Sequence, residues 1–215
     1  SSFVTIRSRF SISVTRISNA LGVSGMCLPS NNNTCCRVSR VNLPKTKELL
    51  ELTHISPKPK PIPENKMEEL LLKSAMFKTK LSNYQNLNIT HVVIEEPLLN
   101  SNNVYTIGTL LRFNTLIFKD IYDVLGIVPE FISTYNSRKF AFPHLVKEND
   151  KGKFVLFGGY PKDIDKKVII WELVSKREPQ IAWQYTKNQT LKKECFDQSD
   201  AYCCGLGFMK MINIW

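Results

Sequence analysis

The segment Phe196-Asp197-Gln198-Ser199-Asp200-Ala201-Tyr202 places two aspartates three residues apart at the start of an apolar stretch. On a helix, this spacing puts both carboxylates on one face. Much earlier in the chain, His91-Val92-Val93-Ile94-Glu95-Glu96-Pro97-Leu98 has the pattern of a short buried strand that ends in carboxylates. A strand-end glutamate and a helical Asp-x-x-Asp can together hold divalent cations beside a phosphodiester.

Each half of this acidic motif has an alternative interpretation. Side chains alternate along a strand, so Glu95 and Glu96 face opposite ways and only one of them can serve a site; the sequence does not decide which. Asp197 could instead be the N-cap of the helix, with Asp200 in its first turn, where the helix dipole favours negative charge. It is the combination of the two segments that favours a metal site.

The rest of the pattern predicts an α/β sandwich around a mixed sheet. A turn-rich tip, Pro29–Thr34, predicts a hairpin, and Gly126 closes a long amphipathic helix. The helix that begins at Glu64 is expected to bury Met67, Leu70, Leu71, Ala75 and Met76. Strands are predicted at Ile12–Ser18, Gly25–Leu28, Cys35–Val41, His91–Leu98, Pro129–Tyr135 and Phe154–Phe157, and helices at Glu64–Ser82, Val104–Leu125, Asp165–Ser175 and Asp197–Met211.

Length and composition set limits on the class of protein. A chain of 215 residues with 43% hydrophobic content can form one large domain, or one domain with an extension. We expect a basic N-terminal extension at residues 1–10 and a single domain over 11–215. No apolar run reaches the length of a membrane span. The six cysteines lack zinc-ligand spacing, which favours reduced thiols and a reducing compartment.

The net charge of +10 is unevenly distributed. Residues 1–47 contain seven Lys or Arg residues and no acid, which favours binding to a polyanion, most simply nucleic acid. A Ser-rich, Arg-rich, acid-free segment is also typical of an organellar transit peptide. Residues 57–63 form a stiff Pro-Lys connector within the domain. The expected nucleic-acid contacts are Arg7, Arg9, Arg37, Arg40, Lys45, Lys58, Lys60, Arg138 and Lys139.

Three segments resemble a known family. Val93-Ile94-Glu95-Glu96-Pro97-Leu98, Thr109-Leu110-Leu111-Arg112-Phe113-Asn114 and Phe196-Asp197-Gln198-Ser199-Asp200-Ala201 resemble the RuvC-type Holliday-junction resolvases, in the phage-like branch of the RNase H-like superfamily. The resemblance covers roughly residues 14–209. It implies an RNase H-like mixed five-stranded sheet flanked by helices, and a Mg²⁺-dependent nuclease acting on branched DNA. It also implies that Glu95, Asp197 and Asp200 are catalytic residues and metal ligands.

One acidic position of that family is missing from this sequence. In the family, the first strand ends in a catalytic Asp, and a Gly in a Val-Thr-Gly-like triplet follows seven residues later. Here Val23-Ser24-Gly25 fits the triplet, which puts Ser18 at the Asp position; a shift of one residue puts Asn19 there. No Asp or Glu occurs before Glu48. Arg16, on the same strand face as Ser18, could neutralise the remaining carboxylates in place of a cation, or could point to solvent.

Three functions follow from these observations. The first is a nucleic-acid-binding protein that has lost the first catalytic carboxylate. In that case it would be a non-catalytic component of an organellar ribonucleoprotein such as the mitochondrial ribosome, with RNA and protein partners and no membrane. The second is an active Mg²⁺-dependent Holliday-junction-resolving endonuclease. The third is a phage-encoded nuclease of unknown substrate, in the cytoplasm of an infected cell.

Overall fold

The computed structural model of the chain describes residues 2–6, 11–19, 45–54, 59–97, 103–161 and 163–214, the first three of these ranges by their backbone alone. The predicted hairpin of Gly25–Leu28 and Cys35–Val41 lies outside these residues. Cys195, Cys203 and Cys204, which lie inside them, are buried as reduced thiols. None of the helices in the described ranges is long and apolar enough to cross a membrane.

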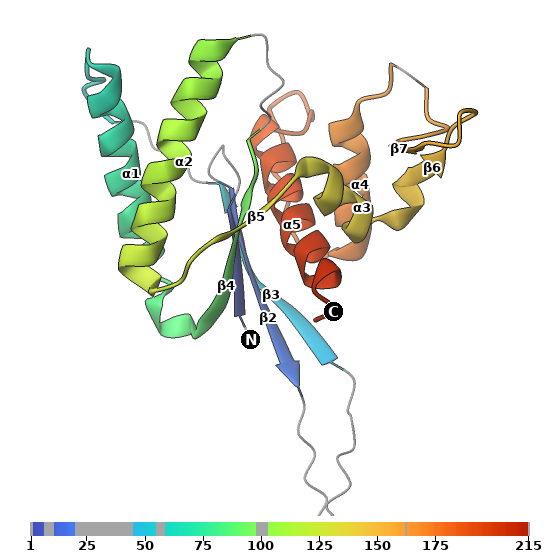
Figure 1. The fold of residues 1–215 in the computed structure, drawn as a ribbon, viewed down its shortest axis with the longest axis horizontal. Coiled ribbons are helices and arrows are strands. Elements are labelled where there is room, and N and C mark those ends of the chain that lie inside the picture. Colours follow the sequence, from blue (N-terminus) through green and yellow to red (C-terminus); the bar gives the residue numbers. More distant parts are fainter. Residues whose placement is uncertain are drawn as a thin grey trace, which may run out of the picture.

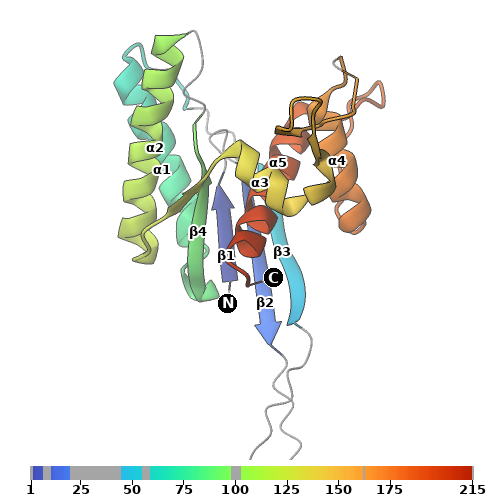
Figure 2. The same cartoon turned by 45° about the vertical axis from the view of Figure 1, so that its right-hand side comes forward.

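The centre of the molecule is a sheet with the strand order β3-β2-β1-β4-β5. Strands β1, β2 and β3 pair antiparallel, whereas β4 lies parallel to β1 and β5 lies parallel to β4. Figure 2 shows the sheet with helices on both sides. The mixed α/β class predicted from the sequence is therefore confirmed. The strands are β1 (Ser2–Ile6), β2 (Ser11–Asn19), β3 (Lys45–His54), β4 (Ile89–Glu95) and β5 (Glu130–Ile132).

Strand β1 differs from the prediction of an N-terminal extension at residues 1–10. Ser2–Ile6 is the central strand of the sheet, with β2 on one side and β4 on the other. The strand predicted at Ile12–Ser18 exists, but it is the second strand of the sheet. The run Phe3-Val4-Thr5-Ile6 is rich in aromatic and β-branched residues, which favour extended backbone. A central strand also pairs its backbone along both edges, which a free extension cannot do.

Helices α1 (Lys66–Ser82) and α2 (Val104–Leu125) pack against each other on one face of the sheet (Figure 1). The bounds of α2 match the prediction, with Asn103 as N-cap and the left-handed Gly126 as C-cap. The face predicted for α1 is right for Leu70, which is buried, and wrong for the other four residues, which are exposed: Met67, Leu71, Ala75 and Met76. The buried stripe, whose members follow one another at three or four residues, or about one helical turn, is Leu70, Ser74, Phe77 and Leu81.

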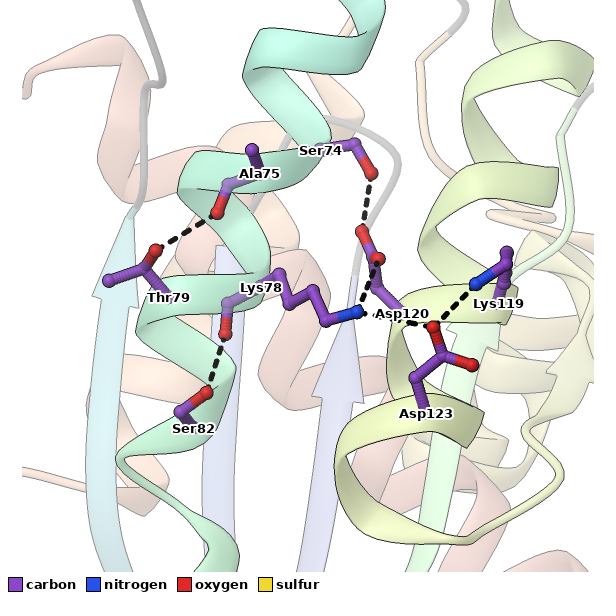
Figure 3. A network of polar contacts seen from close by, with 8 residues as sticks. All are labelled: Ser74, Ala75, Lys78, Thr79, Ser82, Lys119, Asp120 and Asp123. Carbon is purple, nitrogen blue, oxygen red and sulfur yellow. Dashed lines mark hydrogen bonds and ion pairs between the residues drawn. The ribbon is translucent and has the colours of Figure 1, made fainter.

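Figure 3 shows that the contact between α1 and α2 is partly polar. The hydroxyl of Ser74 donates to the buried carboxylate of Asp120. Lys78 of α1 reaches Asp123 of α2 at 3.1 Å and lies 3.8 Å from Asp120. Because α1 and α2 together bury Val92 and Ile94 of β4, the network helps to fix how the two helices pack on this face of the sheet.

The opposite face of the sheet is covered by α5 (Lys193–Met211), with α3 (Thr134–Ala141) and α4 (Lys166–Arg177) packed against α5 (Figure 1). The prediction of a strand over Pro129–Tyr135 is wrong beyond β5. Ser133 accepts a hydrogen bond from the backbone of Asn136 and so begins α3 as its N-cap. A separate hairpin of β6 (Val146–Glu148) and β7 (Phe154–Leu156) follows α3.

Candidate functional site

Alternation along β4 decides which glutamate faces the site. Val92 and Ile94 belong to the core beneath α1 and α2, whereas Val93 packs with Cys204 and Phe208 of α5. Residues two apart on a strand share a face, so Glu95 is on the α5 side with Val93. Glu95 is buried and Glu96 is exposed. The structure therefore resolves the alternative that the sequence left open, in favour of Glu95.

The aspartates of α5 lie on the stripe that faces the sheet. The helix begins at Lys193, with Lys192 as N-cap, so Asp197 and Asp200 are inside the helix and are not caps. Both are buried, at 7% and 3% exposure. Asp197, Asp200 and Cys204 follow at three and four residues, which aligns them on one face. The capping alternative considered from the sequence is wrong for both aspartates.

Strand β4 and helix α5 run in opposite directions across this interface. The His91 ring contacts the Phe208 ring at a centroid distance of 6.0 Å. Two residues further along β4, Val93 packs with Cys204, which lies four residues earlier on α5. Two residues of a strand and four residues of a helix both advance by about 6 Å. Two more residues along β4 and four residues back along α5 therefore place Glu95 at the level of Asp200. We call Glu95, Asp197 and Asp200 the acidic cluster.

Helix α3 holds two members of the acidic cluster. The hydroxyl of Thr134 donates to Glu95 Oε1 at 2.8 Å, and Arg138 Nη2 donates to Asp200 Oδ1 at 3.2 Å. Thr134 and Arg138 are four residues apart and so lie on one face of α3. The side chains of Arg138 and Asp200 are only 13% and 4% exposed, so their ion pair is shielded from water. One helix thus joins the strand-end acid to the helical acid.

The structure separates Ser18 and Arg16 from the acidic cluster. Arg16 pairs with Ser2 at the amino end of β1, and Ser18 lies two residues beyond it. Glu95 follows Ile94, which pairs with Ile6 at the carboxyl end of β1. Ser18 and Glu95 are therefore about seven residues apart along the sheet, roughly 23 Å at 3.3 Å per residue. The alignment that put Ser18 at the missing Asp position took Ile12–Ser18 as the first strand of the sheet, whereas this segment is the second strand.

The described residues do not fit a two-ion Mg²⁺ centre. Among them, no group of three or more His, Cys, Asp or Glu residues is arranged to hold a metal ion. One carboxylate oxygen of Asp200 is already occupied by the guanidinium of Arg138. A two-ion centre needs several carboxylates free to bridge the cations. The cluster as it stands is neutralised in part by a protein cation.

The residues predicted to contact nucleic acid differ in where the structure places them. Lys139 and Lys60 are exposed, as expected for phosphate contacts. Arg138 is turned inward, onto Asp200 and over the ring of Phe157 at 5.7 Å, which differs from the surface role predicted for it. Lys45 is the first residue of β3, where the structure describes the backbone alone. The remaining predicted contacts lie outside the described residues: Arg7, Arg9, Arg37, Arg40 and Lys58.

Sequence reasoning missed Thr134 and the pairing of Arg138 with Asp200. A signal for Thr134 was present, because Ser133-Thr134 directly precedes a segment that can form a helix, and serine is a favoured N-cap. A helix starting there would have placed Thr134 and Arg138 on one face. No pattern in the sequence indicates that this face packs on α5.

Comparison with known proteins yields a structural likeness alone. No family model and no curated protein matches the sequence. Among solved structures, the chain is similar to the one described as "Thermus thermophilus RuvC structure", with a TM-score of 0.49 and 10% sequence identity. The superposition covers 98% of this chain and 96% of that one.

Proposed function

We propose that the chain is a nucleic-acid-binding protein with an RNase H-like, nuclease-like arrangement, in which Arg138 takes the place of catalytic cations at the acidic cluster. The observation that carries this proposal is the shielded ion pair between Arg138 and Asp200. A buried carboxylate needs a compensating positive charge, and either a metal ion or a guanidinium supplies it. Here the guanidinium is part of the fold.

The sequence next to the cluster supports the loss of catalysis. The pairing of β1 with β4 ends at Ile6, which lies opposite Ile94, one residue before Glu95. In the sequence Ile6 is followed by Arg7, Ser8, Arg9 and Phe10, so this end of the central strand brings no carboxylate. The missing first acid of the resolvase pattern is thus assigned to the end of β1, instead of to Ser18. Without it, a two-ion hydrolytic mechanism lacks a bridging ligand.

Binding to nucleic acid rests on charge. The chain carries 29 Lys or Arg against 19 Asp or Glu, and residues 1–47 contain no acid. Such an excess attracts phosphates and releases counterions when they bind. The specific form of this proposal is a structural role on RNA in a mitochondrial ribonucleoprotein. That form rests on the acid-free basic charge of residues 1–47 and not on a separate targeting extension, because Ser2–Ile6 is a strand of the sheet.

The binding proposal is tested by fluorescence anisotropy over a range of salt concentrations. The probes are a labelled four-way DNA junction, a DNA duplex and a single-stranded RNA. Replacing Arg7 and Arg9 with Gln should lower the slope of log affinity against log salt by up to about 2, because each lost phosphate contact lowers it by about 1. The matched control replaces the exposed Lys187 and Lys193 and should leave the slope unchanged. Absence of binding to every probe would refute the proposal.

A second function is favoured by one observation. Glu95, Asp197 and Asp200 are all buried, although burying carboxylates is costly, and clusters of buried ionisable groups concentrate at functional sites. That observation favours an active Mg²⁺-dependent junction-resolving endonuclease. Incubation of a four-way junction with Mg²⁺ separates the two functions. Cleavage that Glu95→Gln abolishes would establish the enzyme, and an intact junction that stays bound supports the non-catalytic role.

A further inference from the structure

A second face of α3 borders an open groove. Its volume is about 570 Å³, within the usual range of ligand sites. The residues that line it come from α3, from the turn that follows and from the β6–β7 hairpin: Tyr135, Lys139, Phe140, Pro143, Val146 and Phe154. Figure 1 shows α3 and this hairpin on the α5 side of the sheet, away from α1 and α2.

Aromatic rings and a cation dominate the groove. Phe154 is 66% exposed and Tyr135 is 38% exposed, so both present ring surface to solvent. The ammonium of Lys139 lies 5.9 Å from the Tyr135 ring centroid and 5.7 Å from that of Phe140. A cation over aromatic faces is held loosely by the ring quadrupoles and can move to a stronger anionic partner.

The groove and the acidic cluster share helix α3. Thr134 and Arg138 face the cluster, and the residues directly after them, Tyr135 and Lys139, line the groove. A ligand in the groove therefore lies beside the acidic cluster. The same helix would couple the two, since it contributes a side chain to each at every turn.

The charge of the surrounding segment decides the kind of ligand. Residues 134–156 contain five Lys or Arg and two acids, and one of the five, Arg138, is neutralised by Asp200. Lys139 is the cation that lines the groove itself. The exposed Lys151 and Lys153 add positive charge at the tip of the hairpin, whereas Lys147 lies beside Gly158 and Gly159 on the other face of the hairpin from Phe154. Aromatic rings flanked by cations match single-stranded nucleic acid, whose bases stack while its phosphates pair with lysines. An apolar peptide would gain nothing from that charge.

We infer that the groove between α3 and the β6–β7 hairpin binds unpaired nucleotides, with a base stacked on Phe154 or Tyr135 and a phosphate held by Lys139. This inference rests on the proposed nucleic-acid function and names the form of nucleic acid that this part of the molecule recognises. It predicts a preference for single strands, or for junctions with unpaired bases, over continuous duplex.

The experiment measures binding of a fluorescein-labelled single-stranded oligonucleotide, as DNA and as RNA, beside the matching duplex. Phe154→Ala should weaken single-strand affinity roughly 5- to 150-fold, the range for removal of one stacking aromatic, and Phe154→Trp should retain it. Lys139→Gln should reduce the salt slope on single strands by about 0.7. A 2-aminopurine placed in the single strand should lose fluorescence when it stacks in the wild-type groove and not in Phe154→Ala.

Tyr105→Ala is the matched control, because Tyr105 is 91% exposed and lies on α2, on the other face of the sheet. It should leave all affinities unchanged. If Phe154→Ala behaves like this control while the wild-type protein binds nucleic acid, the groove inference is wrong and the proposed function stands. If the wild-type protein binds no nucleic acid, both are wrong. Binding of duplex in preference to single strands would also overturn the groove inference.

Discussion

Arg138 of α3 and Asp200 of α5 form an ion pair of 3.2 Å between Nη2 and Oδ1, with side chains only 13% and 4% exposed. One turn earlier on α3, Thr134 donates a hydrogen bond to Glu95 at the end of β4. Helix α3 therefore acts as a clamp between the strand-end acid and the helical acids. Whatever the acidic cluster does, its geometry depends on this helix.

The ion pair predicts strong coupling between its two residues. Arg138→Met or Asp200→Leu alone leaves an uncompensated buried charge and should lower the free energy of unfolding by about 3–5 kcal/mol. The double variant removes both charges and should lose much less than the sum of the two. Urea denaturation of the four proteins measures the cycle. Lys139→Met, an exposed neighbour, should change stability by less than about 0.5 kcal/mol. Additive losses would show that the two charges do not interact.

The contact between α1 and α2 predicts an asymmetry between two aspartates of α2. Ser74→Ala removes the donor to the buried Asp120 and should cost about 1–3 kcal/mol, the penalty for leaving a buried acceptor without that bond. Asp123 is more exposed, so Asp123→Asn should cost less stability than Ser74→Ala, although it weakens the contacts with Lys78 and Lys119. Both variants are compared by urea denaturation. Equal losses would contradict the role assigned to burial.

Glu69 on α1 predicts a dependence of stability on acid pH. Hydrogen bonds from Lys66 and then Lys73 lower the pKa of Glu69 from 4.5 to about 2. A depressed pKa in the folded state means that the contribution to stability is present above pH 4.5 and is lost as the pH falls toward 2. NMR titration of the side-chain carboxyl group measures the pKa directly. Lys66→Gln with Lys73→Gln should return the pKa toward 4.5, and an unchanged pKa would show that the lysines do not cause the shift.

Sequence patterns predicted elements well where periodicity and end signals agreed. Helix α2 has a long amphipathic repeat between Asn103 and Gly126, and its predicted bounds match the structure. The prediction of an N-terminal extension was wrong, because Arg7 and Arg9 dominate the composition of residues 1–10, whereas the apolar run that precedes them is too short to show a clear period. Strand β1 is only five residues long, and its place in the sheet depends on pairing with β4, which is far away in the sequence. Local patterns carry no information about such pairing.

The acidic cluster was predicted as a set of residues, whereas its environment was not. Glu95, Asp197 and Asp200 followed from spacing and from the family resemblance, and the structure places all three on the interface between the sheet and α5. The alternation of Glu95 with Val93 could not be assigned to a face until the partner of Val93 was known. The inward turn of Arg138 depends on the packing of α3 against α5, so charge alone suggested a surface role for it.

The packing of α3 against α5 predicts opposite effects for two glycines. A Cβ atom added at Gly207 of α5 would lie 2.7 Å from the Cα atom of Ser137, closer than backbone atoms tolerate. Gly207→Ala should therefore push α3 outward, lower stability by about 1–3 kcal/mol or more and displace Thr134 and Arg138 from the acidic cluster. At Gly108 of α2 no atom lies within 4 Å of an added Cβ, and Ala is favoured over Gly inside a helix. Gly108→Ala should consequently raise stability by about 0.5–1 kcal/mol.

Urea denaturation of both variants measures these changes, and for Gly207→Ala the coupling energy between Arg138 and Asp200 should also shrink. If Gly207→Ala were as stable as Gly108→Ala and kept that coupling, the close approach of α3 to α5 would not be what holds the clamp in place.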